Sequence, residues 1–95
     1  MSYLLRYSPE ALSDLDDVWD GVLNASQSPD TAERYVRELM EKVSEKKDFP
    51  ASGIPLYYRG LFTGFYSVNY KAYKAFYRVR DDRMEVLRVL FGESE

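Results

Sequence analysis

The 95 residues fit a single domain spanning 1–95, and the composition is that of an ordinary globular chain, with 45% hydrophobic, 31% charged and 16% aromatic residues. The sequence contains no Cys and no His, which excludes disulfides, thiolate metal sites, a cysteine nucleophile and the commonest general base. The apolar runs are far shorter than a membrane span and the N-terminus lacks the apolar core of a signal peptide, so we expect a cytoplasmic protein without membrane contact.

The net charge of −3 is unevenly distributed along the chain. Residues 1–48 hold six Lys or Arg against eleven Asp or Glu, whereas residues 57–92 hold seven against three. The C-terminal half is therefore expected to form a basic surface on an acidic protein, which suits an anionic partner such as nucleic acid or an acidic peptide. The same charges also fit sheet edges that use Lys and Arg to avoid self-association.

The chain opens with a predicted short strand at residues 3–7, followed by a helix. Ser8-Pro9-Glu10 combines a Ser cap, Pro at the first helical position and an acid in the first turn. Apolar residues then recur at helical spacing and indicate a helix of about four turns. These residues, Trp19 among them as a default core residue, are Leu12, Leu15, Trp19 and Val22.

A second helix is predicted after a loop at residues 24–27. Ser28-Pro29-Asp30 repeats the same start signal, and apolar residues continue at helical spacing as far as Val43. The two amphipathic helices are expected to form a helical hairpin. Two prolines and a glycine within Phe49–Pro55 then end the helical region.

The remaining chain is rich in β-branched and aromatic residues and predicts three strands, at 62–68, 73–80 and 84–91. Asp81-Asp82-Arg83 is expected to form the turn between the second and third. The last strand is apolar on both faces except at Glu85 and Arg88, which is typical of a strand inside a sheet. The predicted fold is α+β: an N-terminal strand, an α-helical hairpin on one sheet face, and a three-stranded antiparallel meander.

Several motifs follow one another in a fixed order along nearly the whole chain. They are Tyr7-Ser8-Pro9-Glu10-Ala11, Asp14-Leu15, Trp19, Phe49-Pro50, Gly53, Tyr73-Lys74-Ala75-Phe76-Tyr77-Arg78-Val79 and Glu85-Val86-Leu87-Arg88-Val89-Leu90. Together with the order of the predicted elements, this set resembles the RelE/ParE toxin superfamily of bacterial toxin–antitoxin modules, which includes plasmid stabilisation proteins.

The resemblance implies a toxin that inhibits growth when free and is neutralised by a cognate antitoxin wrapped around its sheet and helices. It implies no cofactor. In the RelE-like branch, Lys, Arg and a Tyr or His on the sheet and tail cut messenger RNA on the ribosome without metal. The ParE-like branch poisons DNA gyrase and lacks that cluster.

The sequence departs from the nuclease branch in two places. The usual basic positions of the second meander strand fall near Phe65, Ser67 and Asn69, and the tail reads Phe91-Gly92-Glu93-Ser94-Glu95, with two acids and no basic residue. RNA cleavage needs a base, an acid and positive charge at the scissile phosphate. The chain is therefore placed nearer the ParE-like branch, with gyrase as the expected target and catalytic residues unassigned. A ribosome-dependent mRNA interferase with an altered site, or an inactive decayed toxin acting as a binding module, remain the alternatives.

Six residues are candidates for contact with the target or the antitoxin: Lys71, Tyr73, Lys74, Arg78, Arg80 and Arg88. In the functional interpretation they form one surface for an anionic partner, with tyrosines available for stacking. In the structural interpretation they are solvated strand residues and packing tyrosines. Arg88 is the strongest candidate because it stands alone among apolar neighbours; the structural alternative is an ion pair with a carboxylate such as Glu85 or a helix residue.

Acidic residues recur along the first predicted helix at Glu10, Asp14 and Asp17. Several carboxylates on one face are what a hard divalent cation requires. A row of acids opposite an apolar stripe is more often a solvated face, favoured here by the helix N-terminus. The sequence therefore predicts no metal site.

Overall fold

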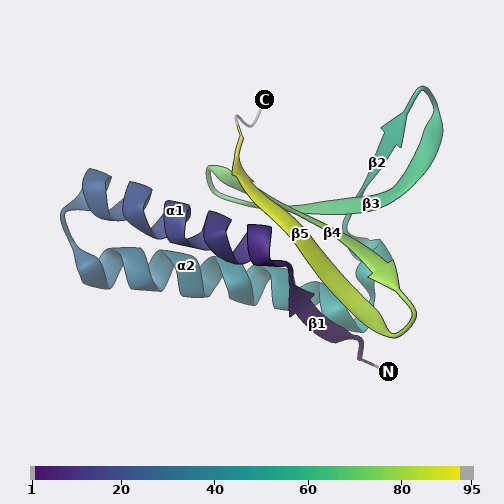
Figure 1. Cartoon of the computed structure of the whole chain (residues 1–95), viewed down its shortest axis with the longest axis horizontal. Coiled ribbons are helices and arrows are strands. Elements are labelled where there is room, and N and C mark those ends of the chain that lie inside the picture. The colour runs from purple at the N-terminus through teal and green to yellow at the C-terminus, as the bar shows by residue number, and fades with distance from the viewer. Residues whose placement is uncertain (1, 93–95) are drawn as a thin grey trace.

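The structure, a computed structural model, describes residues 2–92 and folds this part of the chain into two helices and a five-stranded sheet (Figure 1). The elements are β1 (Leu4–Tyr7), α1 (Pro9–Ser26), α2 (Pro29–Ser44), two short 3₁₀ turns (Glu45–Asp48 and Pro50–Ser52), β2 (Ile54–Tyr58), β3 (Leu61–Tyr70), β4 (Tyr73–Arg80) and β5 (Arg83–Phe91). The two antiparallel helices form the expected hairpin on one side of the sheet (Figure 1). Within the described residues, no helix is both long and apolar enough to span a membrane.

Both helices begin at the predicted Ser-Pro signals. The Ser8 hydroxyl accepts a hydrogen bond of 3.0 Å from the Ala11 amide, and the Ser28 hydroxyl accepts one of 3.2 Å from Thr31. The prediction of a loop from residue 24 was wrong, since α1 continues to Ser26. Nothing in that segment breaks a helix; the helix ends where Gln27 adopts a left-handed φ of 57° and donates its amide to Leu23.

The sheet has the strand order β1-β5-β4-β3-β2, with β1 parallel to β5 and the other pairs antiparallel. As predicted, β5 is an inner strand. Strand β2 was not predicted, because Pro55 lacks an amide proton and so weighs against a strand. β2 tolerates this proline because it lies at the edge of the sheet.

The core lies between the helices and the facing side of the sheet. Its largest buried side chain is Tyr77, whose hydroxyl donates a hydrogen bond to the Pro50 carbonyl and whose ring stacks on Tyr66 at 5.5 Å between centroids. Burial raises the pKa of Tyr77 to about 12. The other buried core residues are Ala11, Leu15, Val18, Leu39, Val43, Val68, Ala75, Met84, Val86 and Val89.

The segment after α2 is held against this core at Gly53, where a side chain has no room. A Cβ there would collide with the Tyr77 hydroxyl and lie 2.9 Å from its ring carbon Cζ and 3.2 Å from the Ser67 carbonyl oxygen. The close approach of Gly53 therefore lets Tyr77 reach Pro50.

Gly53→Ala should lower the free energy of unfolding by about 1–3 kcal/mol, because the added methyl group overpacks a closed core. Chemical denaturation followed by circular dichroism measures this change. Gly92→Ala is the matched control, since a Cβ at Gly92 meets nothing within 4 Å. Equal stability of the Gly53→Ala variant and the wild type would contradict the packing described.

Candidate functional site

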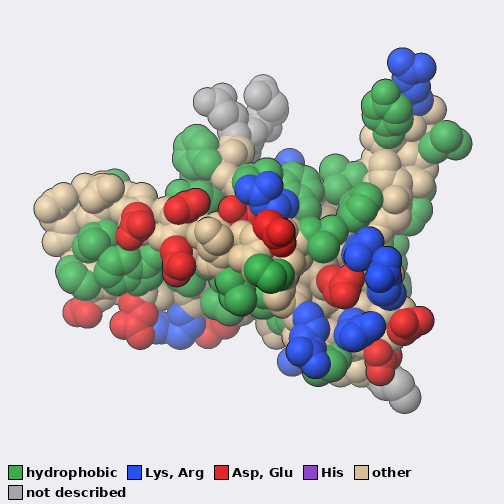
Figure 2. Space-filling model, in the orientation of Figure 1, with side chains coloured by type: hydrophobic (Ala, Val, Ile, Leu, Met, Phe, Trp, Pro, Cys, Tyr) green, Lys and Arg blue, Asp and Glu red, His purple; other side chains and the backbone are tan. Residues whose placement is uncertain are grey.

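The sheet presents one face to the helices and the other to solvent. Alternate side chains of a strand point to opposite faces, and Ala75 and Tyr77 of β4 point into the core. The opposite side, here termed the open face, therefore carries Leu4, Arg6, Phe65, Ser67, Asn69, Lys74, Phe76, Arg78, Arg80, Arg83, Glu85, Arg88 and Leu90, of which Ser67 is itself buried. Lys and Arg side chains gather at the end of the molecule where β1, β4 and β5 lie (Figure 2).

The six residues predicted as binding candidates do not form one surface. Lys74, Arg78, Arg80 and Arg88 belong to the open face. Tyr73 points to the opposite face of β4, and Lys71, in the turn before this strand, lies with it against Tyr35 of α2. Their contact with a target or an antitoxin remains a prediction.

Lys71 and Tyr73 belong to an aromatic cluster in which Tyr35 of α2 contacts tyrosines of the sheet. The Lys71 ammonium lies 5.5 Å from the ring centroid of Tyr35 and 5.4 Å from that of Tyr70. Tyr73 packs edge-on against Tyr35 at 6.0 Å. The Tyr70 hydroxyl donates a 2.6 Å hydrogen bond to Glu38; burial and this carboxylate raise the pKa of Tyr70 to about 12. These tyrosines therefore attach the sheet to the helix.

On the open face, within residues 2–92, Arg78 is paired with a carboxylate, whereas Arg80 and Arg83 are not. Arg78 Nε lies 2.9 Å from Glu85 Oε1, and this hydrogen bond, with the charges of Arg78, Arg80 and Arg83, holds the pKa of Glu85 below its usual value. Arg80 and Arg83 lie directly opposite each other on β4 and β5, and neither forms an ion pair with another residue of the range 2–92. Two like charges at directly opposed positions disfavour the pairing of the strands.

Arg88 forms an ion pair with Asp14 of α1. Arg88 Nε and Nη2 donate to the two oxygens of this carboxylate at 2.8 and 3.1 Å, and the Val89 amide donates to the same carboxylate at 2.8 Å. The hydrogen bond from Arg88 is the main reason that the pKa of Asp14 lies below 3.8. Of the two interpretations of Arg88, the structure shows the ion pair with a helix residue; half of its side chain stays exposed.

The prediction of a solvated acidic face on α1 was wrong for Asp14, which is only 7% exposed. It was correct for Glu10 and Asp17, which are exposed. The sequence pattern did not reveal the difference because the partner of Asp14 lies 74 positions away in the chain. Within residues 2–92, no group of three or more acidic side chains is placed to hold a metal ion.

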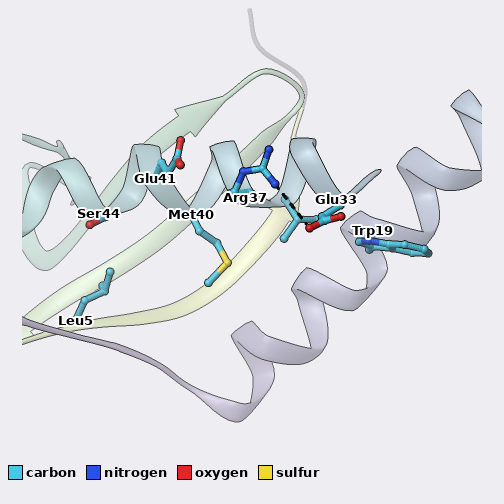
Figure 3. A pocket seen from close by; sticks show the side chains of 8 residues that line it. Leu5, Trp19, Glu33, Arg37, Met40, Glu41 and Ser44 are labelled. Carbon is cyan, nitrogen blue, oxygen red and sulfur yellow. Dashed lines mark ion pairs between the residues drawn. The ribbon is translucent and has the colours of Figure 1, made fainter. Parts of the chain in front are cut away.

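An apolar groove of about 450 Å³ lies between α1, α2 and β1 (Figure 3). Its lining consists of Leu5, Trp19, Val36 and Met40, with Glu33, Arg37, Glu41 and Ser44 around them. The interpretation of Trp19 as a core residue was wrong, since its ring is only partly buried and lines this groove. Val18 occupies the core position, and the next residue points about 100° further round the helix.

The sequence over residues 5–94 matches the family described as the ParE toxin of the type II toxin–antitoxin system parDE. The chain therefore belongs to this family of toxins. The structure resembles that of the chromosomal ParDE toxin–antitoxin system from P. aeruginosa, with 20% identity, a TM-score of 0.80 and coverage of 97% of this chain and 98% of the other.

Two further solved structures share the fold. The toxin–antitoxin complex RelBE2 from Mycobacterium tuberculosis gives 22% identity and a TM-score of 0.69, covering 96% of this chain and 92% of that one. The isolated E. coli RelE toxin gives 19% identity and a TM-score of 0.65, covering 99% and 88%. No match to a curated protein sequence was found.

Asp14→Asn should lower the free energy of unfolding by about 1–3 kcal/mol near neutral pH, because the amide can no longer accept three charge-assisted hydrogen bonds. A carboxylate with a depressed pKa stabilises the fold above its unfolded pKa and loses that effect as pH falls through its folded pKa. The difference in stability between wild type and Asp14→Asn should therefore become smaller as the pH falls below 3.8, the ordinary pKa of an Asp carboxyl.

Urea titrations over a series of pH values measure this difference. Asp16→Asn, an exposed change on the same helix, serves as the control and should leave stability nearly unchanged at every pH. A difference between wild type and Asp14→Asn that is independent of pH would contradict the role assigned to this ion pair.

Proposed function

We propose that this type II toxin inhibits growth by acting on DNA gyrase rather than by cleaving messenger RNA. The observation that carries the proposal is the match to the ParE toxin family over nearly the whole chain. The pKa values of four titratable groups in the described part of the chain support it, because these groups are poorly suited to RNA cleavage.

Cleavage through a ribose 2′-hydroxyl requires a general base with a pKa near the working pH. The chain has no His, and burial raises the pKa values of Tyr7 and Tyr77 to about 12. The carboxylates of Asp14 and Glu85 are weak bases because arginines hold their pKa values below the usual range. None of these groups accepts a proton readily at neutral pH.

Within residues 2–92, the positive charge that a scissile phosphate needs is not concentrated beside the β3 positions of the open face. The β3 positions of the open face are Phe65, Ser67 and Asn69, which carry no charge. Arg78 and Arg88 are each paired with a carboxylate. The cations of the open face that form no ion pair within residues 2–92 are spread along it. Arg6, Arg80 and Arg83 lie towards the start of β5, and Lys74 lies opposite Leu90 near its end.

The apolar groove supports a second part of the proposal, the neutralisation of the toxin by a cognate antitoxin. Two of the similar structures are described as toxin–antitoxin systems or complexes. A concave surface walled by Trp19, Val36 and Met40 and edged by charges fits the apolar side of an amphipathic helix from such a partner.

Purified toxin in molar excess should abolish the supercoiling of relaxed plasmid by purified gyrase, and added antitoxin should restore it. In the same preparation, primer extension on translated messages should show no new cuts. Uninhibited gyrase together with cuts at codons would reject the gyrase proposal in favour of a ribosome-dependent nuclease.

Met40→Lys should weaken antitoxin binding by about tenfold or more, because a charge enters an apolar groove, while growth arrest by the free toxin should persist. Titration calorimetry with the antitoxin and a growth assay measure the two effects. The control, Lys42→Met, changes an exposed residue of the same helix outside the groove lining. Unchanged antitoxin affinity in Met40→Lys would place the antitoxin elsewhere.

A further inference from the structure

The outer part of β2 and β3, here termed the aromatic hairpin (residues 54–65), extends away from the body of the molecule (Figure 1). In the space-filling view it is a narrow arm that carries hydrophobic side chains (Figure 2). Its large apolar side chains are mostly exposed: Ile54 52%, Tyr57 63%, Tyr58 66%, Leu61 72% and Phe62 48%. So dense a group of exposed apolar residues on a small protein marks an interaction site.

Glycines fix the shape of the hairpin rather than making room for neighbours. Gly60 and Gly64 have φ values of 80° and 88°, and a Cβ at either position would meet nothing within 4 Å. Arg59, with φ of 54°, and Gly60 form the two-residue turn of the hairpin, both in the left-handed region that such turns use. The register shifts near Gly64, so the hairpin bends at this bulge.

Contacts along the hairpin hold it in this shape. The Thr63 hydroxyl donates a 2.8 Å hydrogen bond to the Leu56 carbonyl across the bulge. Rings connect the tip to the core in succession, with centroids 5.9 Å apart for Tyr57 and Phe62 and 5.3 Å for Phe62 and Tyr66. The Arg59 guanidinium lies 5.6 Å from the ring centroid of Tyr58. The exposed side chains are therefore pre-organised for binding, which reduces the entropy that binding costs.

Both faces of the hairpin are apolar. Tyr58 and Leu61 are directly opposed on one face, and Tyr57 and Phe62 are opposed on the other. A projecting element with two apolar faces fits into a cleft of a folded partner, whereas a flexible segment would be better received by a groove. The apolar groove of this chain, which is proposed above to receive an antitoxin segment, lies elsewhere, between α1, α2 and β1.

The charges of the hairpin favour a protein partner over a nucleic acid. Arg59 is the one charged residue among residues 54–65, whereas binding to a phosphate backbone depends on several cations. Tyr, Phe and Arg in a patch depleted of other charges are typical of the centre of a protein interface.

We propose that the aromatic hairpin is the element with which the toxin engages its protein target, by insertion into a cleft walled by apolar side chains with a carboxylate facing Arg59. The inference rests on the proposed function only for the identity of the target: gyrase is the protein that carries this cleft if the proposed function holds. The apolar groove proposed above for the antitoxin is a different surface, so the hairpin can be mutated separately.

Two hairpin variants, one double and one single, test the proposal in growth assays. The Tyr58→Ser, Leu61→Ser double variant removes exposed apolar side chains of one face. Arg59→Asn removes the single charge and places Asn, which tolerates positive φ better than Arg, in the turn, so folding is preserved or improved. The control is the Leu4→Ser, Leu12→Ser double variant, which removes two leucines that are each 51% exposed elsewhere.

At an induction level where wild type and control arrest growth, both hairpin variants should fail to do so, with at least about tenfold more toxin needed for arrest. Their affinity for the antitoxin and their molar mass by light scattering should match the wild type. Arrest by the hairpin variants at the wild-type level would overturn the inference. Loss of antitoxin binding, or of self-association shown by the wild type, would also overturn it by assigning the hairpin to the antitoxin or to a second copy.

The two proposals fail in different ways. A wild type that arrests growth without inhibiting purified gyrase contradicts the gyrase proposal, while the comparison of hairpin variants with the control still decides whether the target is engaged here. A wild type that inhibits gyrase, with hairpin variants that inhibit it equally, keeps the gyrase proposal and overturns the hairpin inference.

Discussion

The arrangement of the helices depends on how α1 completes the edge of β5. β1 pairs only with residues 83–86 of β5, so the second half of that strand lacks a neighbouring strand on this side. α1 supplies the missing partners: the Ser8 amide and hydroxyl donate to the carbonyls of Val86 and Leu87, and the Asp14 carboxylate accepts from Val89 and Arg88. Ser8 also caps α1 through the Ala11 amide, so one residue fixes both the start of the helix and its place against the sheet.

Local signals made most of the architecture predictable, and long-range pairing explains most of what was missed. The Ser-Pro starts act within one turn, and the apolar run of β5 reports that both of its faces are covered, so both could be read from the sequence. Asp14 looked like one of several helix acids because its partner comes from the far end of the chain. Pro55 concealed β2, which the fold accepts only because that strand lies at the sheet edge. Trp19 kept helical spacing, and only the packing of α1 against α2 and β1 decides that its ring lines a groove.

Three surfaces of different shape and charge result. The apolar groove is concave, the open face carries arginines of which Arg78 and Arg88 are neutralised by carboxylates, and the aromatic hairpin is convex with a single charge. The proposed function uses two of these surfaces, the apolar groove for the antitoxin and the aromatic hairpin for the target. The match to the ParE toxin family over residues 5–94 supports this proposal.

The most direct test of this account is to replace Tyr58 with a photo-crosslinking amino acid and to identify what it captures in cells as growth stops. We expect covalent capture of a gyrase subunit. Co-expression of the antitoxin should leave this capture unchanged if the two sites are separate, as proposed here, and should reduce it if they are shared. The same substitution at Lys74, on the open face, should capture much less gyrase. Capture of ribosomal protein or ribosomal RNA at Tyr58, with no gyrase, would contradict the account.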